Sequence, residues 1–258
     1  MKKTALITGA TSGIGKAYAM QLAKSGYDLI ITGRRQAQIE DVARSIQKAY
    51  HVRVKVYLVD FECSKQYNAF IEQIKKERID VLINNAGYGA KKTFTEDTYT
   101  NQQAMIDVHV KTSVALCHSV AQQMKLRRSG WIINVSSLAG YLLLPKSAMY
   151  CATKAFLTSF TQSLAMELMP YNIRVQVLCP GFVHTDFHAK LAIEEKKCQS
   201  IGPVRWMSAE AVVATSLKGI EEGVVVCIPG KWNQAAYHLL KAVPKKLYYK
   251  VVTVTHKA

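Results

Sequence analysis

Short apolar runs rich in β-branched residues alternate with longer amphipathic segments along most of this chain, and this alternation restricts the fold more than any other feature. The strand-like runs cover residues 4–8, 28–32, 52–59, 81–84, 131–135 and 174–178, with a seventh at 224–228. Helical spacing of apolar residues marks segments such as 15–25, 35–49, 101–124 and 150–168. Because the strands are apolar throughout, the order strand, helix, strand predicts a doubly wound parallel sheet of about seven strands with helices on both faces, a three-layer α/β/α fold.

No linker, repeat or low-complexity tract interrupts this pattern, and we therefore predict one domain over residues 1–258. A composition of 49% apolar and 20% charged residues is typical of a soluble globular protein. No run of eighteen apolar residues is present, so we predict neither a signal peptide nor a transmembrane span. The six cysteines are far apart and include no CxxC pair, which favours a reducing, cytoplasmic setting without a metal site.

The formal net charge of +16 predicts attraction to anionic partners. A phosphorylated cofactor, an acyl thioester or a membrane surface would fit, whereas no nucleic-acid reader motif is present and we predict no nucleic-acid binding. The segment from residue 223 to 258 has six lysines and no acid, and it includes a basic tail at about 240–258. This tail suits peripheral contact with anionic lipid, chiefly through Lys241, Lys245, Lys246 and Lys250, although a solvated tail or a subunit interface would fit as well.

A glycine-rich loop follows the first predicted strand. Residues 8–15 read TGATSGIG, between that strand and an amphipathic helix. Glycines at these positions let the backbone turn tightly and approach a pyrophosphate at the helix N-terminus. The sequence therefore predicts a dinucleotide-binding loop rather than a plain strand-to-helix turn, with contacts from Gly9, Thr11, Ser12, Gly13, Ile14 and Gly15.

The end of the second predicted strand indicates which dinucleotide binds. An NAD enzyme carries an acidic residue here for the ribose 2′-hydroxyl, but this chain has Gly33 followed by Arg34 and Arg35. Two guanidinium groups suit a 2′-phosphate through forked, charge-assisted hydrogen bonds, so we predict NADP(H). The alternative is that one or both arginines simply begin the next helix in solvent.

Polar residues also follow the third and fourth predicted strands. Asp60 ends the third, and the fourth runs into Asn84, Asn85, Ala86 and Gly87. The carboxyl ends of parallel strands share one edge of the sheet, where an adenine and a ribose would lie. We predict that Asp60, Asn85, Ala86 and Gly87 contact the cofactor, although Asp60 could instead cap a helix.

Tyr150 and Lys154 are the predicted acid/base pair, since residues four apart on a helix share a face. The strand before them ends in Ser136 and Ser137, which can place a hydroxyl beside the phenol. A neighbouring ammonium favours the phenolate, so we expect the pKa of Tyr150 to be lowered. Tyr150 can then exchange a proton with a substrate oxygen while a hydride passes at carbon.

These motifs together resemble the classical subfamily of the short-chain dehydrogenase/reductase family over nearly the whole chain. The matching motifs are TGxxxGxG at residues 8–15, NNAG at 84–87, Ser137 thirteen residues before the tyrosine, YxxxK at 150–154 and a PG turn at 180–181. The resemblance implies a Rossmann-like seven-stranded fold and a homo-oligomer, a dimer or tetramer. It also implies that Ser137 polarises the substrate oxygen, that Tyr150 is the acid/base, that Lys154 also binds the nicotinamide ribose and that Thr185 lies near the carboxamide. We expect Tyr150, Pro180, Gly181 and Val183 to contact the cofactor as well.

One position departs from the family pattern. An asparagine usually occupies the middle of the long fourth helix and supports a proton relay to the lysine, and this chain has His109 there. A neutral imidazole has one donor and one acceptor and can take the place of the amide. We predict that His109 takes part in the relay; a purely structural histidine or impaired turnover are the alternatives.

The substrate is predicted only as a class. Residues 33–60 are similar to reductases that act on steroids and long-chain 3-oxoacyl groups. A lid is expected at about 184–207, where Phe187, Leu191, Ile193, Val204, Trp206 and Met207 could line an apolar pocket or merely pack on the sheet. We therefore expect an NADP(H)-dependent oxidoreductase that reduces a ketone on a lipid-, acyl- or steroid-like substrate. The alternatives are a catalytically weak NADP(H) sensor or scaffold and a protein whose main role is at a membrane surface.

Overall fold

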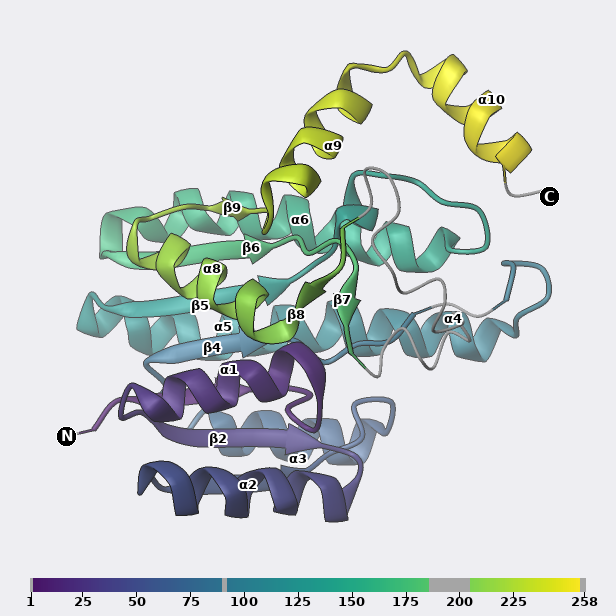
Figure 1. Ribbon diagram of the computed structural model, residues 1–258. Coiled ribbons are helices and arrows are strands. Elements are labelled where there is room, and N and C mark those ends of the chain that lie inside the picture. The colour runs from purple at the N-terminus through teal and green to yellow at the C-terminus, as the bar shows by residue number, and fades with distance from the viewer. Residues whose placement is uncertain (1, 90–91, 186–204, 256–258) are drawn as a thin grey trace.

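A computed structural model of the chain describes residues 2–89, 92–185 and 205–255. These residues form a seven-stranded parallel sheet in the order β3-β2-β1-β4-β5-β6-β9 (Figure 1). The strands are β1 (Thr4–Ile7), β2 (Asp28–Gly33), β3 (Val54–Leu58), β4 (Val81–Asn84), β5 (Gly130–Val135), β6 (Ile173–Leu178) and β9 (Val226–Cys227). Each lies within two residues of its predicted position, and the strand order reverses between β1 and β4, the point at which such sheets bind ligands.

Helices cover both faces of the sheet, as predicted (Figure 1). They are α1 (Gly13–Lys24), α2 (Gln36–Tyr50), α3 (Ser64–Ile74), α4 (Tyr99–Ile106), α5 (Thr112–Arg127), α6 (Ala148–Leu168), α8 (Ala209–Glu221), α9 (Lys231–Ala242) and α10 (Lys245–Thr255). One core joins the sheet to α1, α2 and α8, and a second joins it to α3, α5 and α6. Leu6 and Ile7 are neighbours on β1, both fully buried, and belong to different cores. This two-sided burial is why most strand positions are apolar, although β3 at the edge of the sheet is only partly buried and carries Lys55.

The predicted continuous helix over residues 101–124 is wrong in one respect, because a π-helical segment interrupts it. The segment is η1 (Asp107–Lys111), between α4 and α5. Its wider turn is accompanied by side-chain hydrogen bonds to its carbonyl oxygens: the Thr112 hydroxyl donates to Asp107 at 2.9 Å and the Ser113 hydroxyl to His109 at 2.8 Å. π-Helical turns of this kind often occur at functional sites.

The remaining short elements are η2 (Leu138–Gly140), η3 (Met169–Tyr171) and a two-stranded sheet of β7 (Val183–His184) and β8 (Met207–Ser208). Most of the predicted lid at 184–207 lies outside the described residues. In the C-terminal segment, α9 ends before Pro244 and α10 begins after it, as expected for a residue that breaks helices. No helix in the described part of the chain is long and apolar enough to cross a membrane.

Candidate active site

The carboxyl ends of the central strands open into a cavity of about 590 Å³. Most of the predicted site residues line it, namely Gly9, Thr11, Ser12, Gly13, Ile14, Arg34, Arg35, Asp60, Asn85, Ala86, Gly87, Ser137, Tyr150, Lys154, Pro180, Gly181, Val183 and Thr185. Gly15 and His109 are not among the lining residues. The structure therefore brings the predicted cofactor-binding residues and the predicted acid/base residues together at one edge of the sheet. The order of the motifs along the chain does not show this.

The glycine loop has the shape of an anion-binding turn. Gly9 and Gly13 have φ angles of +67° and +55°, which side chains rarely tolerate. A β-carbon on Gly13 would lie 2.9 Å from Cγ2 of Thr185, and one on Gly15 would collide with the carbonyl oxygen of Gly9. Ser12 is the N-cap of α1, but its side chain makes no capping hydrogen bond. A phosphate would bind to the N–H groups of this first turn, so the loop fits a dinucleotide.

Asn85 shapes this loop from the neighbouring strand. Its side-chain amide donates to the carbonyl oxygens of Thr8 and Gly9, both at 3.0 Å. The Thr8 hydroxyl in turn accepts from the backbone N–H groups of Asn85, at 2.9 Å, and Ala86, at 3.0 Å. The Asn85 amide is thus engaged with the protein itself, and it joins the carboxyl ends of β1 and β4 beneath the cavity.

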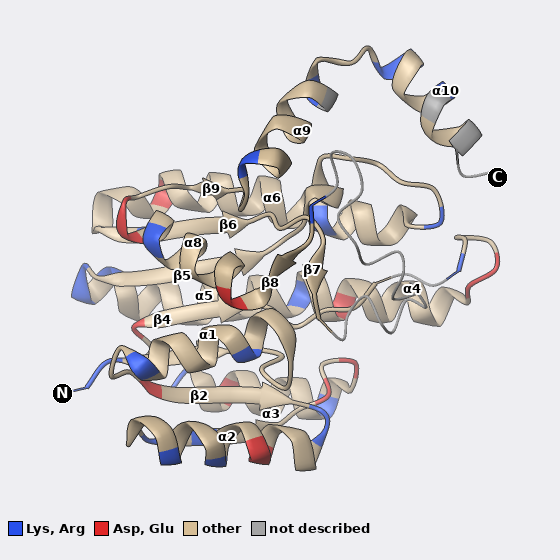
Figure 2. Ribbon diagram, viewed as in Figure 1, with Lys and Arg blue, Asp and Glu red and all other residues tan. Residues whose placement is uncertain are grey.

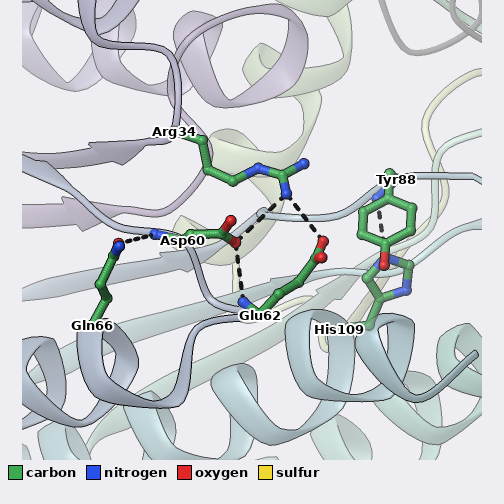
Figure 3. A network of polar contacts seen from close by, with 6 residues as sticks. All are labelled: Arg34, Asp60, Glu62, Gln66, Tyr88 and His109. Atoms are coloured by element: carbon green, nitrogen blue, oxygen red, sulfur yellow. Dashed lines mark hydrogen bonds and ion pairs between the residues drawn. The ribbon is translucent and has the colours of Figure 1, made fainter. Parts of the chain in front are cut away.

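Arg34 lies at the end of β2 in a cluster of acidic residues (Figure 3). Its Nη1 atom lies 3.0 Å from Oε1 of Glu62 and 3.5 Å from Oδ1 of Asp60. The side chain of Arg34 is 54% exposed, so a phosphate could reach the remaining nitrogens. Asp60 does not cap α3, whose N-cap is Cys63. Glu62 was not anticipated from the sequence, because nothing in its spacing marks it as a partner of Arg34.

Arg35 turns toward the glycine loop rather than into solvent. Its Nη2 atom donates to the hydroxyls of Thr11 at 2.9 Å and Ser12 at 3.4 Å. Position 33 has no room for an acidic side chain, since a β-carbon there would lie 2.5 Å from Cγ2 of Thr11. Two positive charges therefore flank the region where a 2′-phosphate would lie, and the residues present fit NADP(H) better than NAD(H).

Ser137, Tyr150 and Lys154 meet at the opposite end of the cavity. Ser137 follows β5 and accepts a hydrogen bond from the backbone N–H of Ala139 at 3.1 Å. Tyr150 and Lys154 lie on α6, with Nζ of Lys154 5.7 Å from the centre of the phenol ring. The same Nζ atom donates to the carbonyl oxygen of Val135 at 2.9 Å. The lysine, 5% exposed, is thus held between β5 and α6.

The expected lowering of the Tyr150 pKa is not what the structure shows. Burial raises the pKa of Tyr150 to about 12, and a hydrogen bond with the Ser137 side chain opposes the change. Burial also lowers the pKa of Lys154 to about 8. Removal from water disfavours the charged form of each group, and at Tyr150 this outweighs the effect of the hydrogen bond with Ser137. The phenol is therefore protonated at neutral pH and poised as an acid.

His109 lies on η1 behind the cavity wall, fully buried, and both of its ring nitrogens are engaged. Nε2 accepts a hydrogen bond from the backbone N–H of Tyr88 at 3.0 Å (Figure 3). Nδ1 lies 2.9 Å from the hydroxyl of Thr153, which donates to the carbonyl oxygen of Tyr150 at 2.9 Å. Burial holds the pKa of His109 well below its usual range, so the ring is neutral and Nδ1 carries the hydrogen.

Two residues in this chain of contacts were not anticipated. Tyr88 follows the NNAG motif and contributes its backbone N–H, which no side-chain pattern reveals. Thr153 lies inside the YxxxK motif, three residues after Tyr150, where a hydroxyl on the inner face of the helix was a usable signal. The ring of His109 also packs edge-on against Tyr88 and Tyr150, with ring centres 5.5 and 6.0 Å apart.

An aromatic cluster lies beside the segment that contributes Gly181 and Val183 to the cavity lining. Trp206 packs against Phe182 and His184, with ring centres 5.1 and 5.0 Å apart. Met207 begins β8 and packs against the core. The other residues predicted for an apolar lid, Phe187, Leu191, Ile193 and Val204, lie outside the described residues.

Comparisons with known proteins identify the family and agree with the fold. A family profile described as short chain dehydrogenase matches residues 3–196. The 3-oxoacyl-(acyl-carrier-protein) reductase FabG of Aquifex aeolicus is 34% identical over 81% of this chain and 86% of its own. The 17-beta-hydroxysteroid dehydrogenase type 3 of Rattus norvegicus is 29% identical over 98% of this chain and 80% of its own. A short-chain dehydrogenase from Sphingobium yanoikuyae, solved in complex with NADPH, superposes with a TM-score of 0.82 at 27% identity, covering 94% of this chain and 96% of that one.

Proposed function

The chain belongs to the short-chain dehydrogenase family, and from this premise we propose that it reduces the ketone of an apolar substrate with NADPH. It is an oxidoreductase of CH–OH and C=O groups, as its relatives are. The observation that carries the proposal is that Ser137, Tyr150 and Lys154 line the same cavity as the glycine loop and both arginines. The sensor or scaffold alternative is not favoured, because a complete set of acid/base residues faces the cofactor cavity.

NADP(H) is the cofactor, supported by the NADPH complex of the Sphingobium relative and by the arginines after β2. When bound, it supplies or accepts the hydride at the nicotinamide. We propose that the first turn of α1 holds the pyrophosphate and that Arg34 and Arg35 hold the 2′-phosphate. Lys154, and the segment from Pro180 to Thr185, would hold the nicotinamide end.

In the reductive direction, the Ser137 hydroxyl would donate a hydrogen bond to the substrate oxygen and fix it beside Tyr150. Tyr150 would then transfer its proton to that oxygen as negative charge develops there. The phenol is in its acid form at neutral pH, which this role requires. The ammonium of Lys154, 5.7 Å from the ring centre, would stabilise the phenolate that remains.

We propose that His109 positions the catalytic helix. Nε2 already accepts from Tyr88 and Nδ1 already pairs with Thr153, so proton transfer through the ring would require one of these hydrogen bonds to break. The route from the loop after β4 through His109 and Thr153 ends on the carbonyl oxygen of Tyr150. A neutral histidine in this place would hold the first turn of α6, and with it the phenol, against the cavity wall.

We further propose that the substrate carries its ketone on an apolar body of the 3-oxoacyl or steroid type. Two relatives named for such substrates, the Aquifex reductase and the rat dehydrogenase, cover most of this chain. The aromatic cluster of Phe182, His184 and Trp206 supplies apolar surface next to the nicotinamide end. Apolar pockets discriminate between neighbouring chain lengths by only about 1 to 3 kcal/mol per methylene, so we propose a substrate class and not a single ketone.

The test is NADPH and NADH oxidation with a panel of 3-oxoacyl thioesters, ketosteroids and aromatic diketones. We expect turnover that prefers NADPH and that falls about 100- to 10,000-fold in Tyr150→Phe, the usual size of a general acid contribution. The matched control is Tyr27→Phe, half-buried at the far end of β2. NADPH binding with no turnover on any class, or turnover that survives Tyr150→Phe, would contradict the proposal.

We also propose that residues 1–258 act as one catalytic domain in the cytoplasm and assemble into a homo-oligomer. Several apolar side chains of α5, α6 and η3 are exposed, namely Leu126, Phe156, Met166 and Met169. Exposed apolar side chains grouped on neighbouring elements mark interaction sites. Sedimentation velocity should give a dimer or tetramer, and Phe156→Glu together with Met166→Glu should shift it to the monomer.

A further inference from the structure

Two long segments of the chain contain no acidic residue. One runs from residue 108 to 166 and includes the loop that joins Ser137 to Tyr150, and the other runs from 223 to the C-terminus and includes α9 and α10. In Figure 2, α9 and α10 carry basic residues and no acidic ones, and they extend beyond the body of the sheet.

The two segments are in contact in the fold. The hydroxyl of Tyr248, on α10, donates to the carbonyl oxygen of Leu143 at 2.7 Å. Tyr237, on α9, packs edge-on against Tyr141 with ring centres 4.7 Å apart. The C-terminal helices therefore rest on the loop between two catalytic residues, although the two segments are distant in sequence.

Apolar side chains are exposed on both sides of this contact. On the loop they are Leu143 and Leu144, 47% and 40% exposed, and on α10 they are Leu247 and Tyr249, 53% and 49% exposed. Leu143 is one partner of this hydrogen bond, and the other three are each adjacent in sequence to Leu143 or Tyr248. A group of large exposed apolar side chains marks a surface that binds something.

Lysines accompany these apolar side chains. Lys245, Lys246 and Lys250 are exposed on α10, and Lys146 follows two residues after Leu144 on the loop. We call the four apolar side chains and these four lysines the C-terminal face. A second copy of the chain is a poor occupant for it, because two such faces would oppose lysine with lysine. An anionic surface complements the charge.

We propose that the C-terminal face docks on a bilayer that contains anionic phospholipids. The apolar side chains would enter the boundary between headgroups and acyl chains, and the lysines would lie at the depth of the phosphates. Docking would bring the active-site loop close to the lipid, where an apolar ketone concentrates. The binding itself is independent of the proposed substrate class.

The test is flotation of the full-length protein with vesicles of phosphatidylcholine alone and of phosphatidylcholine mixed with phosphatidylglycerol. We expect binding to the mixed vesicles only, weakened by added salt. Replacement of Lys245, Lys246 and Lys250 by glutamine should weaken partitioning on the order of 100-fold, at about 1 kcal/mol per lysine near the surface. The matched control removes the same charge elsewhere, with Lys24→Gln, Lys48→Gln and Lys76→Gln, all exposed and outside the C-terminal face.

A second variant separates apolar insertion from charge. Leu247→Ser with Tyr249→Ser keeps every lysine and should still lower the binding at least tenfold. Turnover of a water-soluble ketone, measured on each variant, should stay within about twofold of the parent, which keeps this test separate from that of the proposed activity. Equal binding to neutral vesicles, equal loss in the control triple variant, or self-association of the parent that the α10 substitutions abolish would each overturn the proposal.

Discussion

The Nε2 atom of His109 accepts a hydrogen bond of 3.0 Å from the backbone N–H of Tyr88. Because Nε2 is the acceptor, the ring hydrogen is on Nδ1. The Nδ1 atom lies 2.9 Å from the hydroxyl oxygen of Thr153 and donates to it. Gly87 makes the contact feasible, since a β-carbon there would lie 3.0 Å from Nε2. A histidine in the π-helical turn therefore joins the loop after β4 to the catalytic helix.

His109→Asn should retain at least comparable activity, because an amide can replace one of the two hydrogen bonds while water fills the remaining space. His109→Leu should lower the free energy of unfolding by about 1–3 kcal/mol, since it leaves the N–H of Tyr88 without an acceptor, and should lower kcat because the support of α6 is lost. Steady-state kinetics with a pH profile of kcat checks both. A loss beyond tenfold in His109→Asn would show that the histidine has a role that asparagine cannot fill.

Arg34→Ala should weaken NADPH binding about 10- to 100-fold and leave NADH binding unchanged, because a charge-assisted hydrogen bond contributes about 1.5–3 kcal/mol. Glu62→Gln should strengthen NADPH binding, since it removes a carboxylate that lies 3.0 Å from the same guanidinium. Calorimetric dissociation constants for both cofactors decide the matter. Parallel losses for NADPH and NADH in Arg34→Ala would mean that this arginine does not recognise the 2′-phosphate.

The reductive rate should decline as pH rises through about 8. The pKa of Lys154 is lowered from 10.5 to about 8, so its ammonium is present below that pH and lost above it. Tyr150, with a pKa of about 12, stays protonated across the same range and cannot cause the decline. The measurement is kcat/KM between about pH 6 and 10 at saturating NADPH. A flat profile to the alkaline end would show that the charge on Lys154 is not required.

Lys154→Met should stabilise the fold at neutral pH while abolishing activity. Because the folded-state pKa of Lys154 lies below its unfolded value of 10.5, the unfolded state binds more protons between about pH 8 and 10.5. Stability therefore rises with pH across that window, and below it the buried ammonium costs free energy. Removing the charge should raise the free energy of unfolding by on the order of 2 kcal/mol at pH 7. The gain should vanish above about pH 10.5, where the lysine is neutral in both states.

Urea unfolding of the parent and of Lys154→Met at pH 7 and just above about pH 10.5 checks the prediction. Lys48→Met, on the exposed face of α2, removes a charge from water and should change stability by less than about 0.5 kcal/mol. A destabilised Lys154→Met at pH 7 would mean that the hydrogen bond from Nζ to Val135 outweighs the desolvation of the charge.

The sequence predicted the secondary structure wherever a local pattern of apolar residues encodes it. The strand bounds agree to within two residues, because strands covered on both faces are apolar at most positions. Helix α3 was not predicted, and the π-helical turn at 107–111 reads locally as ordinary helix. Hydroxyl groups of the following turn bond to its carbonyl oxygens. Such choices depend on contacts that a periodic pattern does not encode.

The sequence by itself determined the sheet and the glycine loop and predicted the acid/base residues, because each depends on residue types at fixed local spacing. Only the tertiary structure decided what those residues face. It raised the pKa of Tyr150 through burial, paired Arg34 with Glu62, and turned the Asn85 amide onto the glycine loop. It also placed α10 on the loop between Ser137 and Tyr150. Burial and long-range hydrogen bonding arise only when distant segments pack together, and so they leave no periodic trace in the chain.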